Sequence, residues 1–217
     1  MEETRVGDPT QPRTGNGEQM DRDASSIHQI ADLVELSDMD LGGRSSPDGA
    51  VTILFSDIEG STEMVERLGD EAWFDLLREH NRIVRELVKA HDGTEVKAQG
   101  DGFMLAFMSS RAALACAIEM QHALDGYALE NPDERLRVRV GLHSGFMIQD
   151  GQDYFGRNVI LAARIADRAR GGEIIVSEQL REYTAGDDLA PQFLPPQQLA
   201  LKGLSGTHTV YPVDWSS

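Results

Sequence analysis

The stretch Val51-Thr-Ile-Leu-Phe-Ser-Asp-Ile-Glu-Gly-Ser-Thr62 combines a strand pattern with two features of a polyphosphate site. Its apolar, β-branched run predicts a buried strand that ends on Asp57. The turn Gly60-Ser61-Thr62 then opens a helix, which presents free backbone N–H groups and a positive dipole end to an anion. This combination suits a metal-bound phosphate. The plainer interpretation is that Asp57 only caps the helix.

A second carboxylate, Asp101, lies in Val96-Lys-Ala-Gln-Gly-Asp-Gly-Phe-Met-Leu-Ala-Phe107, at the expected tip of a hairpin. Two carboxylates on neighbouring strand ends can share a pair of Mg²⁺ ions, with phosphates and water completing the shells. Gly-Asp-Gly is also an ordinary hairpin tip. Lys97, four residues before Asp101, strengthens the functional interpretation when all three residues are taken together.

Composition limits the possible partners. The chain has 217 residues, 40% of them hydrophobic and 26% charged, as in a soluble globular protein. Its net charge of −17 argues against nucleic acid and against an anionic membrane surface as partners. We find no apolar stretch of the roughly 18 residues that span a bilayer. The single cysteine, Cys116, lies in an apolar helical run, which predicts a buried thiol and a reducing, cytoplasmic setting.

The chain divides near residue 48. Residues 1–47 are rich in Gly, Ser, Asp, Glu and Pro, which predicts a flexible acidic N-terminal extension. Within it, residues 27–36 have the spacing of a short amphipathic helix. We leave open whether this helix docks on the domain, docks on a partner or forms only transiently. Residues 48–217 form the expected folded domain.

The apolar periodicity of the domain predicts an α+β fold with a ferredoxin-like βαββαβ core and a mixed or antiparallel sheet flanked by helices. The expected helices cover residues 61–91, with a break at Gly69, and residues 109–124 and 156–170. The expected strands cover residues 50–55, 94–99, 103–107, 136–146, 173–177 and 207–213.

Four segments in order resemble the catalytic domain of class III nucleotide cyclases, adenylyl cyclases in particular: Phe55-Ser-Asp-Ile-Glu-Gly-Ser-Thr62, Lys97-Ala-Gln-Gly-Asp101, Arg139-Val-Gly-Leu-His-Ser-Gly145 and Asp153-Tyr-Phe-Gly-Arg-Asn-Val-Ile-Leu-Ala-Ala-Arg164. The later Leu201-Lys-Gly-Leu204 also fits, and the resemblance covers about residues 49–214. It implies that ATP is cyclised to 3′,5′-cyclic AMP and pyrophosphate, by in-line attack of the ribose 3′-oxygen on the α-phosphorus.

The same resemblance implies a role for each motif residue. Asp57 and Asp101 would hold two Mg²⁺ or Mn²⁺ ions, with the Ile58 carbonyl assisting, and Gly60, Ser61 and Thr62 would cradle the phosphates. Lys97 and Asp153 would select adenine, because lysine donates to the ring acceptor N1 and aspartate accepts from the exocyclic amine. Arg164 would stabilise the transition state. Arg139 and Lys202 are candidate triphosphate ligands.

One position departs from the family pattern. The family usually has an asparagine one helical turn before the transition-state arginine, and here that position is Ile160. Isoleucine cannot donate a hydrogen bond, so we expect a slow enzyme, or a substitute donor such as Arg157 or a water molecule. Asn158 is two residues away and points to another part of the helix.

The resemblance also implies a homodimer with two composite sites, because the family takes its metal aspartates from one subunit and its base-selecting pair and arginine from the other. Two enzymatic alternatives fit less well. A guanylyl cyclase is disfavoured by Lys97 and Asp153, and the signature of a diguanylate cyclase is absent. A degenerate cyclase-like module that binds nucleotide or a partner without turnover stays open, and only Ile160 favours it.

Overall fold

The computed structural model describes residues 25–37, 49–185 and 191–216. The helices in this part of the chain are α1 (Ser26–Ser37), α2 (Ser61–Leu68), α3 (Asp70–Ala90), α4 (Ser110–Glu130), the short 3₁₀ helix η2 (Pro132–Glu134), α5 (Arg157–Ala166) and α6 (Glu178–Thr184). The strands are β1 (Val51–Ile58), β2 (Thr94–Gln99), β3 (Gly102–Phe107), β4 (Val138–Gly145), β5 (Ile148–Asp150), β6 (Asp153–Phe155), β7 (Ile174–Ser177), β8 (Gln192–Phe193), β9 (Gln197–Leu199) and β10 (His208–Asp214).

The main sheet is mixed, which confirms the expected fold class. Its strand order is β2-β3-β1-β4-β7-β10-β8, and β9 pairs with β10. The first four strands have the order of a ferredoxin-like core, with β1 antiparallel to both β3 and β4. Strand β7 then adds to β4 in parallel, and β10 adds to β7 antiparallel. The antiparallel pairing of β1 with β3 brings the C-terminal end of β1 next to the β2–β3 turn.

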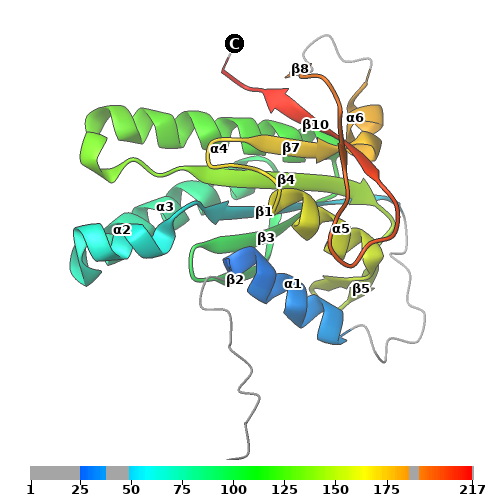
Figure 1. Cartoon of the computed structure of the whole chain (residues 1–217), viewed down its shortest axis with the longest axis horizontal. Helices are drawn as coiled ribbons and strands as arrows, with labels where there is room; N and C mark the ends of the chain where they lie inside the picture. The colour runs from blue at the N-terminus through cyan, green and yellow to red at the C-terminus, as the bar shows by residue number, and fades with distance from the viewer. Residues whose placement is uncertain (1–24, 38–48, 186–190, 217) are drawn as a thin grey trace, which may run out of the picture.

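Helices cover both faces of the sheet (Figure 1). Side chains alternate between the faces along β1. Leu54 belongs to the apolar cluster under α3 and α4, whereas Ile53 and Phe55 belong to the cluster under α1 and α5. Asp57 continues the second set by its odd position, so it emerges on the α1 and α5 face. This face therefore carries the candidate site.

The short helix expected at residues 27–36 is present as α1, and it lies against the domain rather than apart from it (Figure 1). The remaining parts of the expected extension, residues 1–24 and 38–48, lie outside the described residues, so the boundary near 48 stays a prediction. None of the helices in the described ranges has the length and apolar character that a membrane crossing needs.

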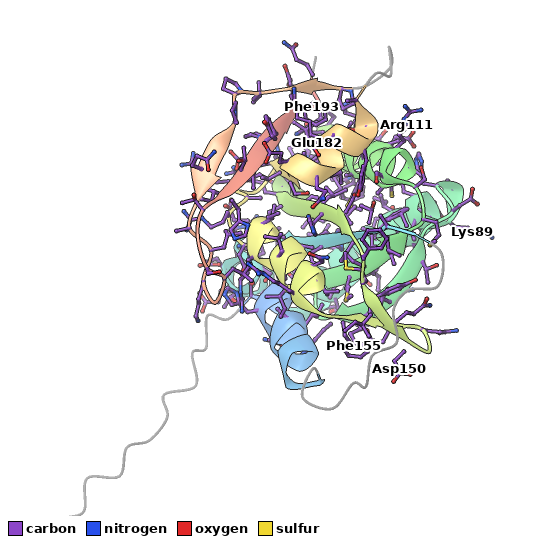
Figure 2. The ribbon with its side chains drawn as sticks, turned by 90° about the vertical axis from the view of Figure 1, so that its right-hand side faces the viewer. Lys89, Arg111, Asp150, Phe155, Glu182 and Phe193 are labelled. Atoms are coloured by element: carbon purple, nitrogen blue, oxygen red, sulfur yellow. The ribbon has the colours of Figure 1, made fainter. Side chains whose placement is uncertain are left out.

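Several boundaries differ from the expected ones. The break at Gly69 occurs as expected, at a positive φ of 80° between α2 and α3. Helix α4 extends to Glu130, because Ala128 is still buried, and it stops just before Pro132. The β5–β6 hairpin was not expected, since its strands are too short to show a period. Figure 2 shows this hairpin through Asp150 and Phe155, at the opposite end of the molecule from Phe193.

Candidate active site

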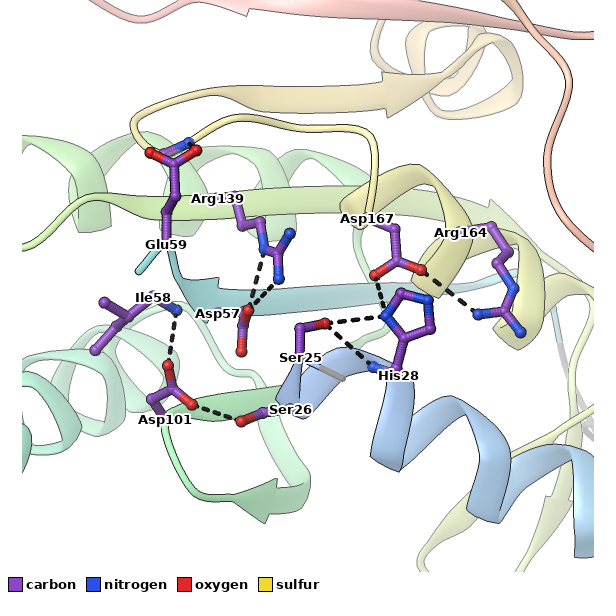
Figure 3. A network of polar contacts seen from close by, with 11 residues as sticks. Ser25, Ser26, His28, Asp57, Ile58, Glu59, Asp101, Arg139, Arg164 and Asp167 are labelled. Carbon is purple, nitrogen blue, oxygen red and sulfur yellow. Dashed lines mark hydrogen bonds and ion pairs between the residues drawn. The ribbon is translucent and has the colours of Figure 1, made fainter. Parts of the chain in front are cut away.

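Two buried carboxylates form the centre of the site. Asp57 is 2% exposed near the end of β1, and Asp101 is 6% exposed at the β2–β3 turn. The antiparallel pairing of β1 with β3 brings the turn beside β1, where the Ile58 backbone N–H donates to Asp101 Oδ2 at 3.3 Å. The structure therefore brings together the two aspartates that the sequence singled out, and Figure 3 shows them side by side.

Arg139 faces Asp57 from the neighbouring strand, since the two residues are register partners in the β1–β4 pair. Its Nε and Nη2 atoms both donate to Asp57 Oδ2, at 3.0 and 2.5 Å. The other oxygen, Oδ1, is buried without a hydrogen-bond partner among the described residues. Burial, and after it the charge of Asp101, raises the pKa of Asp57 to about 6 against the opposing effect of Arg139.

A cavity of about 360 Å³ opens beside Asp57. Gly60, Ser61 and Thr62 line it, and Gly60 reaches the start of α2 with a φ of 72°, which glycine adopts without strain. The N-terminal end of α2 thus meets the cavity, where its backbone N–H groups suit an anion. Ile58 and Arg139 complete the wall on the sheet side.

The aspartate pair fits divalent cations. Both carboxylates are buried, the pKa of Asp57 is raised, and its Oδ1 atom has no hydrogen-bond partner in the described part of the chain. Such an environment favours a bound positive charge. No cluster of three or more His, Cys, Asp or Glu side chains suited to a metal occurs within the described ranges. Mg²⁺ needs only one or two carboxylates when substrate phosphates and water supply its other ligands, so a pair is sufficient.

Lys97 and Asp153 meet in an ion pair, with Lys97 Nζ 2.6 Å from Asp153 Oδ2. They come from β2 and β6, and the Lys97 ammonium also lies 5.5 Å from the centre of the Phe155 ring. The sequence therefore identified a pair that is adjacent in space although 56 positions separate the two residues. Neither residue lines the cavity beside Asp57.

Arg164 lies on α5, almost fully buried, with its Nη1 atom 3.5 Å from Asp167 Oδ2. Asp167 also contacts His28 of α1, whose Nδ1 atom lies 3.3 Å from Asp167 Oδ1 (Figure 3). Sequence reasoning missed Asp167, although a carboxylate three residues after an arginine is a recognisable helical pair. Burial raises the pKa of Asp167, and the electrostatic effects of its neighbours His28 and Arg164 oppose this rise.

The remaining predicted positions are less central. Lys202 is exposed between β9 and β10 and does not line the cavity. Ile160 is half-buried and packs against the apolar cluster under α1 and α5. Arg157 is exposed, and the Asn158 amide donates to the Phe146 carbonyl at 2.8 Å, so Asn158 is directed toward the end of β4.

Helix α1 supplies contacts that no sequence pattern indicated. The Ser26 hydroxyl donates to Asp101 Oδ1 at 2.5 Å, across 75 positions of the chain. Ser25, Ser26 and Gln29 form one side of the cavity beside Asp57. The amphipathic spacing of α1 indicated a buried face, but it gave no information about the surface that this face would meet.

Comparison with known proteins shows which family the chain resembles. Residues 44–213 match the family described as the adenylate and guanylate cyclase catalytic domain. A receptor-type adenylate cyclase of Trypanosoma brucei brucei, GRESAG 4.3, is 31% identical over 183 residues, which is 65% of this chain and 15% of that protein. The chain therefore spans a small part of the length of this relative.

Two solved structures extend the comparison. The adenylyl cyclase CyaB from P. aeruginosa is 26% identical, with a TM-score of 0.69 over 76% of this chain and 94% of that one. The guanylyl cyclase Cya2 is 25% identical, with a TM-score of 0.67 over 80% of this chain and 94% of that one. The likeness thus extends to cyclases named for either purine.

Proposed function

The chain belongs to the family of class III nucleotide cyclase catalytic domains, and we propose that it converts ATP to 3′,5′-cyclic AMP and pyrophosphate. The observation that carries this proposal is the pair of buried aspartates, Asp57 and Asp101, beside a cavity lined by a helix N-terminus. Such an arrangement suits a metal-bound triphosphate. We also propose a cytoplasmic setting, in which the free thiol of Cys116 stays reduced.

In this proposal Asp57 and Asp101 hold two Mg²⁺ or Mn²⁺ ions, and the Ile58 carbonyl assists. When bound, the cations neutralise phosphate charge and lower the pKa of the attacking hydroxyl. The backbone of Gly60 and Ser61 orients the phosphates from the start of α2. Binding would release Arg139 from Asp57 Oδ2, so that its guanidinium can turn to a phosphate oxygen with two N–H groups.

Purine choice is assigned to Lys97 and Asp153. Their ion pair holds a donor and an acceptor side by side, 2.6 Å apart, and adenine N1 and its amine need this same combination. Guanine presents N1–H and O6 in the corresponding places, so the pair would face it with the wrong polarity. We therefore expect ATP rather than GTP to be the substrate.

We further propose that the active form is a symmetric homodimer. Lys97, Asp153, Arg164 and Lys202 do not line the cavity beside Asp57. A second copy could bring its own Lys97–Asp153 pair and its Arg164 to that cavity, while Asp57 and Asp101 serve the other site in return. Two-fold symmetry would then give two identical composite sites.

The direct test is incubation of the purified chain with ATP or GTP and with Mg²⁺ or Mn²⁺, followed by mass detection of cyclic nucleotides. We expect cyclic AMP from ATP, and none from the Asp57→Ala variant. A Lys97→Ala variant should lower kcat/KM for ATP by about 10- to 100-fold, from the loss of one charged hydrogen bond. Lys89→Ala, at an exposed lysine of α3, is the matched control.

One observation favours a second candidate, a nucleotide-binding module without turnover. Ile160 occupies the position where the family resemblance expects a hydrogen-bond donor, and it is packed among apolar side chains. Metal-dependent ATP binding without any cyclic product, in a folded protein, would favour this candidate over the cyclase.

A further inference from the structure

Helix α1 (Ser26–Ser37) covers the aspartate site directly. The Ser26 hydroxyl donates to Asp101 Oδ1, while the Ile58 N–H occupies Oδ2, so both oxygens of this carboxylate are engaged by the protein. Ser25, Ser26 and Gln29 wall the cavity beside Asp57. A cation at Asp101 would compete with the Ser26 hydroxyl for the lone pairs of Oδ1 (Figure 3).

An apolar stripe anchors the helix. Ile27 and Ile30 are 0% exposed and Ala31 is 1% exposed, at the i, i+3, i+4 spacing of one helical face. They pack in the same cluster as Ile53 and Phe55 of β1, whose alternation leads on to Asp57. The helix therefore occupies the sheet face on which the metal aspartate emerges.

A second set of contacts ties α1 to the other half of the candidate site. His28 lies 3.3 Å from Asp167, and Asp167 in turn pairs with Arg164. Gln99 Nε2 on β2 donates to Gln29 Oε1 at 2.6 Å. One helix thus touches the metal carboxylate Asp101 and, through Asp167, the proposed transition-state arginine.

The position of α1 conflicts with assembly. A second copy has to place its Lys97–Asp153 pair and its Arg164 against the cavity beside Asp57, and α1 forms one side of that cavity. Resting on the proposed function, we propose that α1 is an internal inhibitor. Docked, it competes with cations for Asp101 and with a second copy for the adjoining face, and it must leave before the composite site forms.

Release variants of the full chain test this competition. The double substitution Ile27→Ser and Ile30→Ser removes the anchor without changing the proposed metal, purine or phosphate ligands. We expect Mn²⁺ affinity, read from the free-ion EPR signal, to rise by about 10-fold or more. The reason is that docking of α1 lowers the fraction of molecules whose aspartate site can bind the ion. Dimers should form at correspondingly lower concentration in sedimentation. Ser26→Ala keeps the anchor, so it should raise Mn²⁺ affinity while leaving dimerisation nearly unchanged.

The control is Leu129→Ser, which removes an apolar side chain that is 84% exposed on α4. It should change neither Mn²⁺ affinity nor dimerisation. Thermal melting of every variant shows whether the domain remains folded.

A reversible lock provides the converse test. Gln29→Cys and Gln99→Cys place thiols at two contacting positions, and a short bifunctional thiol reagent with a reducible linkage can join them. The native Cys116 should not react, because it is buried and burial raises its pKa to about 12. Locking should weaken Mn²⁺ binding and dimerisation, and reduction should restore both.

The outcomes separate the two proposals. Stronger Mn²⁺ binding and dimerisation on release, reversed by the lock, support the inhibitor role of α1. If neither property responds to the release variant or to the lock, α1 is only a structural part of the domain and the inference is overturned. If both properties respond but no form makes a cyclic nucleotide, the inhibitory docking stands and the cyclase proposal fails.

Discussion

At the scale of single residues, Asp57 is a carboxylate whose charged form is disfavoured by its surroundings. It is buried next to a second carboxylate, one of its oxygens has no hydrogen-bond partner in the described structure, and its pKa is raised to about 6. Burying such a charge is unfavourable unless positive charge compensates it. Arg139 compensates one oxygen. The other oxygen is the feature that most directly favours a cation.

Ile160 gives the first prediction. It lies one helical turn before Arg164 and carries no donor, so Ile160→Asn should raise the turnover number by about 100-fold, within the range reported for one transition-state donor. The KM for ATP should change little. Ile160→Val is the control, because it keeps the apolar shape without adding a donor. Equal turnover of the Asn and Val variants would count against any role for this position.

His143 gives a prediction about pH. Its ring is buried, Nδ1 lies 2.8 Å from Ser177 Oγ, and burial lowers the pKa of His143 from 6.5 to about 4. As the pH falls, His143 therefore takes up a proton near pH 6.5 in the unfolded chain but only near pH 4 in the folded chain. The stability contribution of neutral His143 is full above pH 6.5 and is lost as pH falls toward 4, by about 3 kcal/mol in total.

The measurement is urea unfolding of the wild type and of His143→Asn at pH 7 and at pH 4.5. The variant lacks the titrating ring, so the advantage of the wild type should shrink at the lower pH. A difference in unfolding free energy that is the same at both pH values would show that His143 does not titrate in this way.

The residues of the site were predictable to an uneven degree. Asp57 and Asp101 could be predicted because one lies at the end of a recognisable strand and the other at a hairpin turn, and the structure places them together. Lys97 and Asp153 needed the family resemblance, since their ion pair joins β2 to a hairpin that shows no sequence period. Ser26 had no signal, because a contact across 75 positions depends on tertiary packing. The roles of all these residues stay proposals.

At the scale of elements, the position of α5 depends on a glycine. A Cβ built on Gly141 of β4 would lie 2.3 Å from the backbone N of Ala166, so this helix packs directly on the strand. Gly141→Ala should lower the free energy of unfolding by about 2–3 kcal/mol through overpacking. It should also reduce cyclic AMP formation, because α5 carries Arg164.

The control for this prediction is Gly126→Ala in α4, where a new Cβ would meet nothing within 4 Å. That change should stabilise the protein by about 0.5–1 kcal/mol, because alanine favours a helix interior. Urea unfolding measures both effects. If Gly141→Ala leaves the free energy of unfolding unchanged, α5 can shift on β4 without loss of stability. The packing of α5 on β4 would then not fix the geometry of the site.

Element boundaries were harder to predict than element types. The βαββαβ core followed from apolar runs and turn residues, and the structure has it. Helix α5 ends at Ala166, before the expected residue 170, because the chain must turn at Gly171 and Gly172 to enter β7. Strands β8 and β9 have two and three residues, too few for alternation to indicate them.

At the scale of the whole molecule, the net charge is −17, yet several basic side chains lie near the candidate site. Arg139, Arg164 and Lys97 each pair with a carboxylate there, at Asp57, Asp167 and Asp153. A triphosphate with its cations could exchange these internal partners for phosphate oxygens. Because each of these cations is already paired and Asp101 adds a further carboxylate, bound divalent cations would be needed to offset the negative field where an anionic substrate binds.

The most direct test of the composite site is complementation between two inactive variants of the chain, Asp57→Ala and Arg164→Ala. Each alone should make no cyclic AMP, because every site of its homodimer lacks one essential residue. Mixed in equal amounts, they should recover up to about a quarter of wild-type activity, since half of randomly paired dimers carry one intact site. Melting curves confirm that both variants are folded. Recovery on mixing would support shared sites, whereas no recovery from folded, dimerising variants would contradict them.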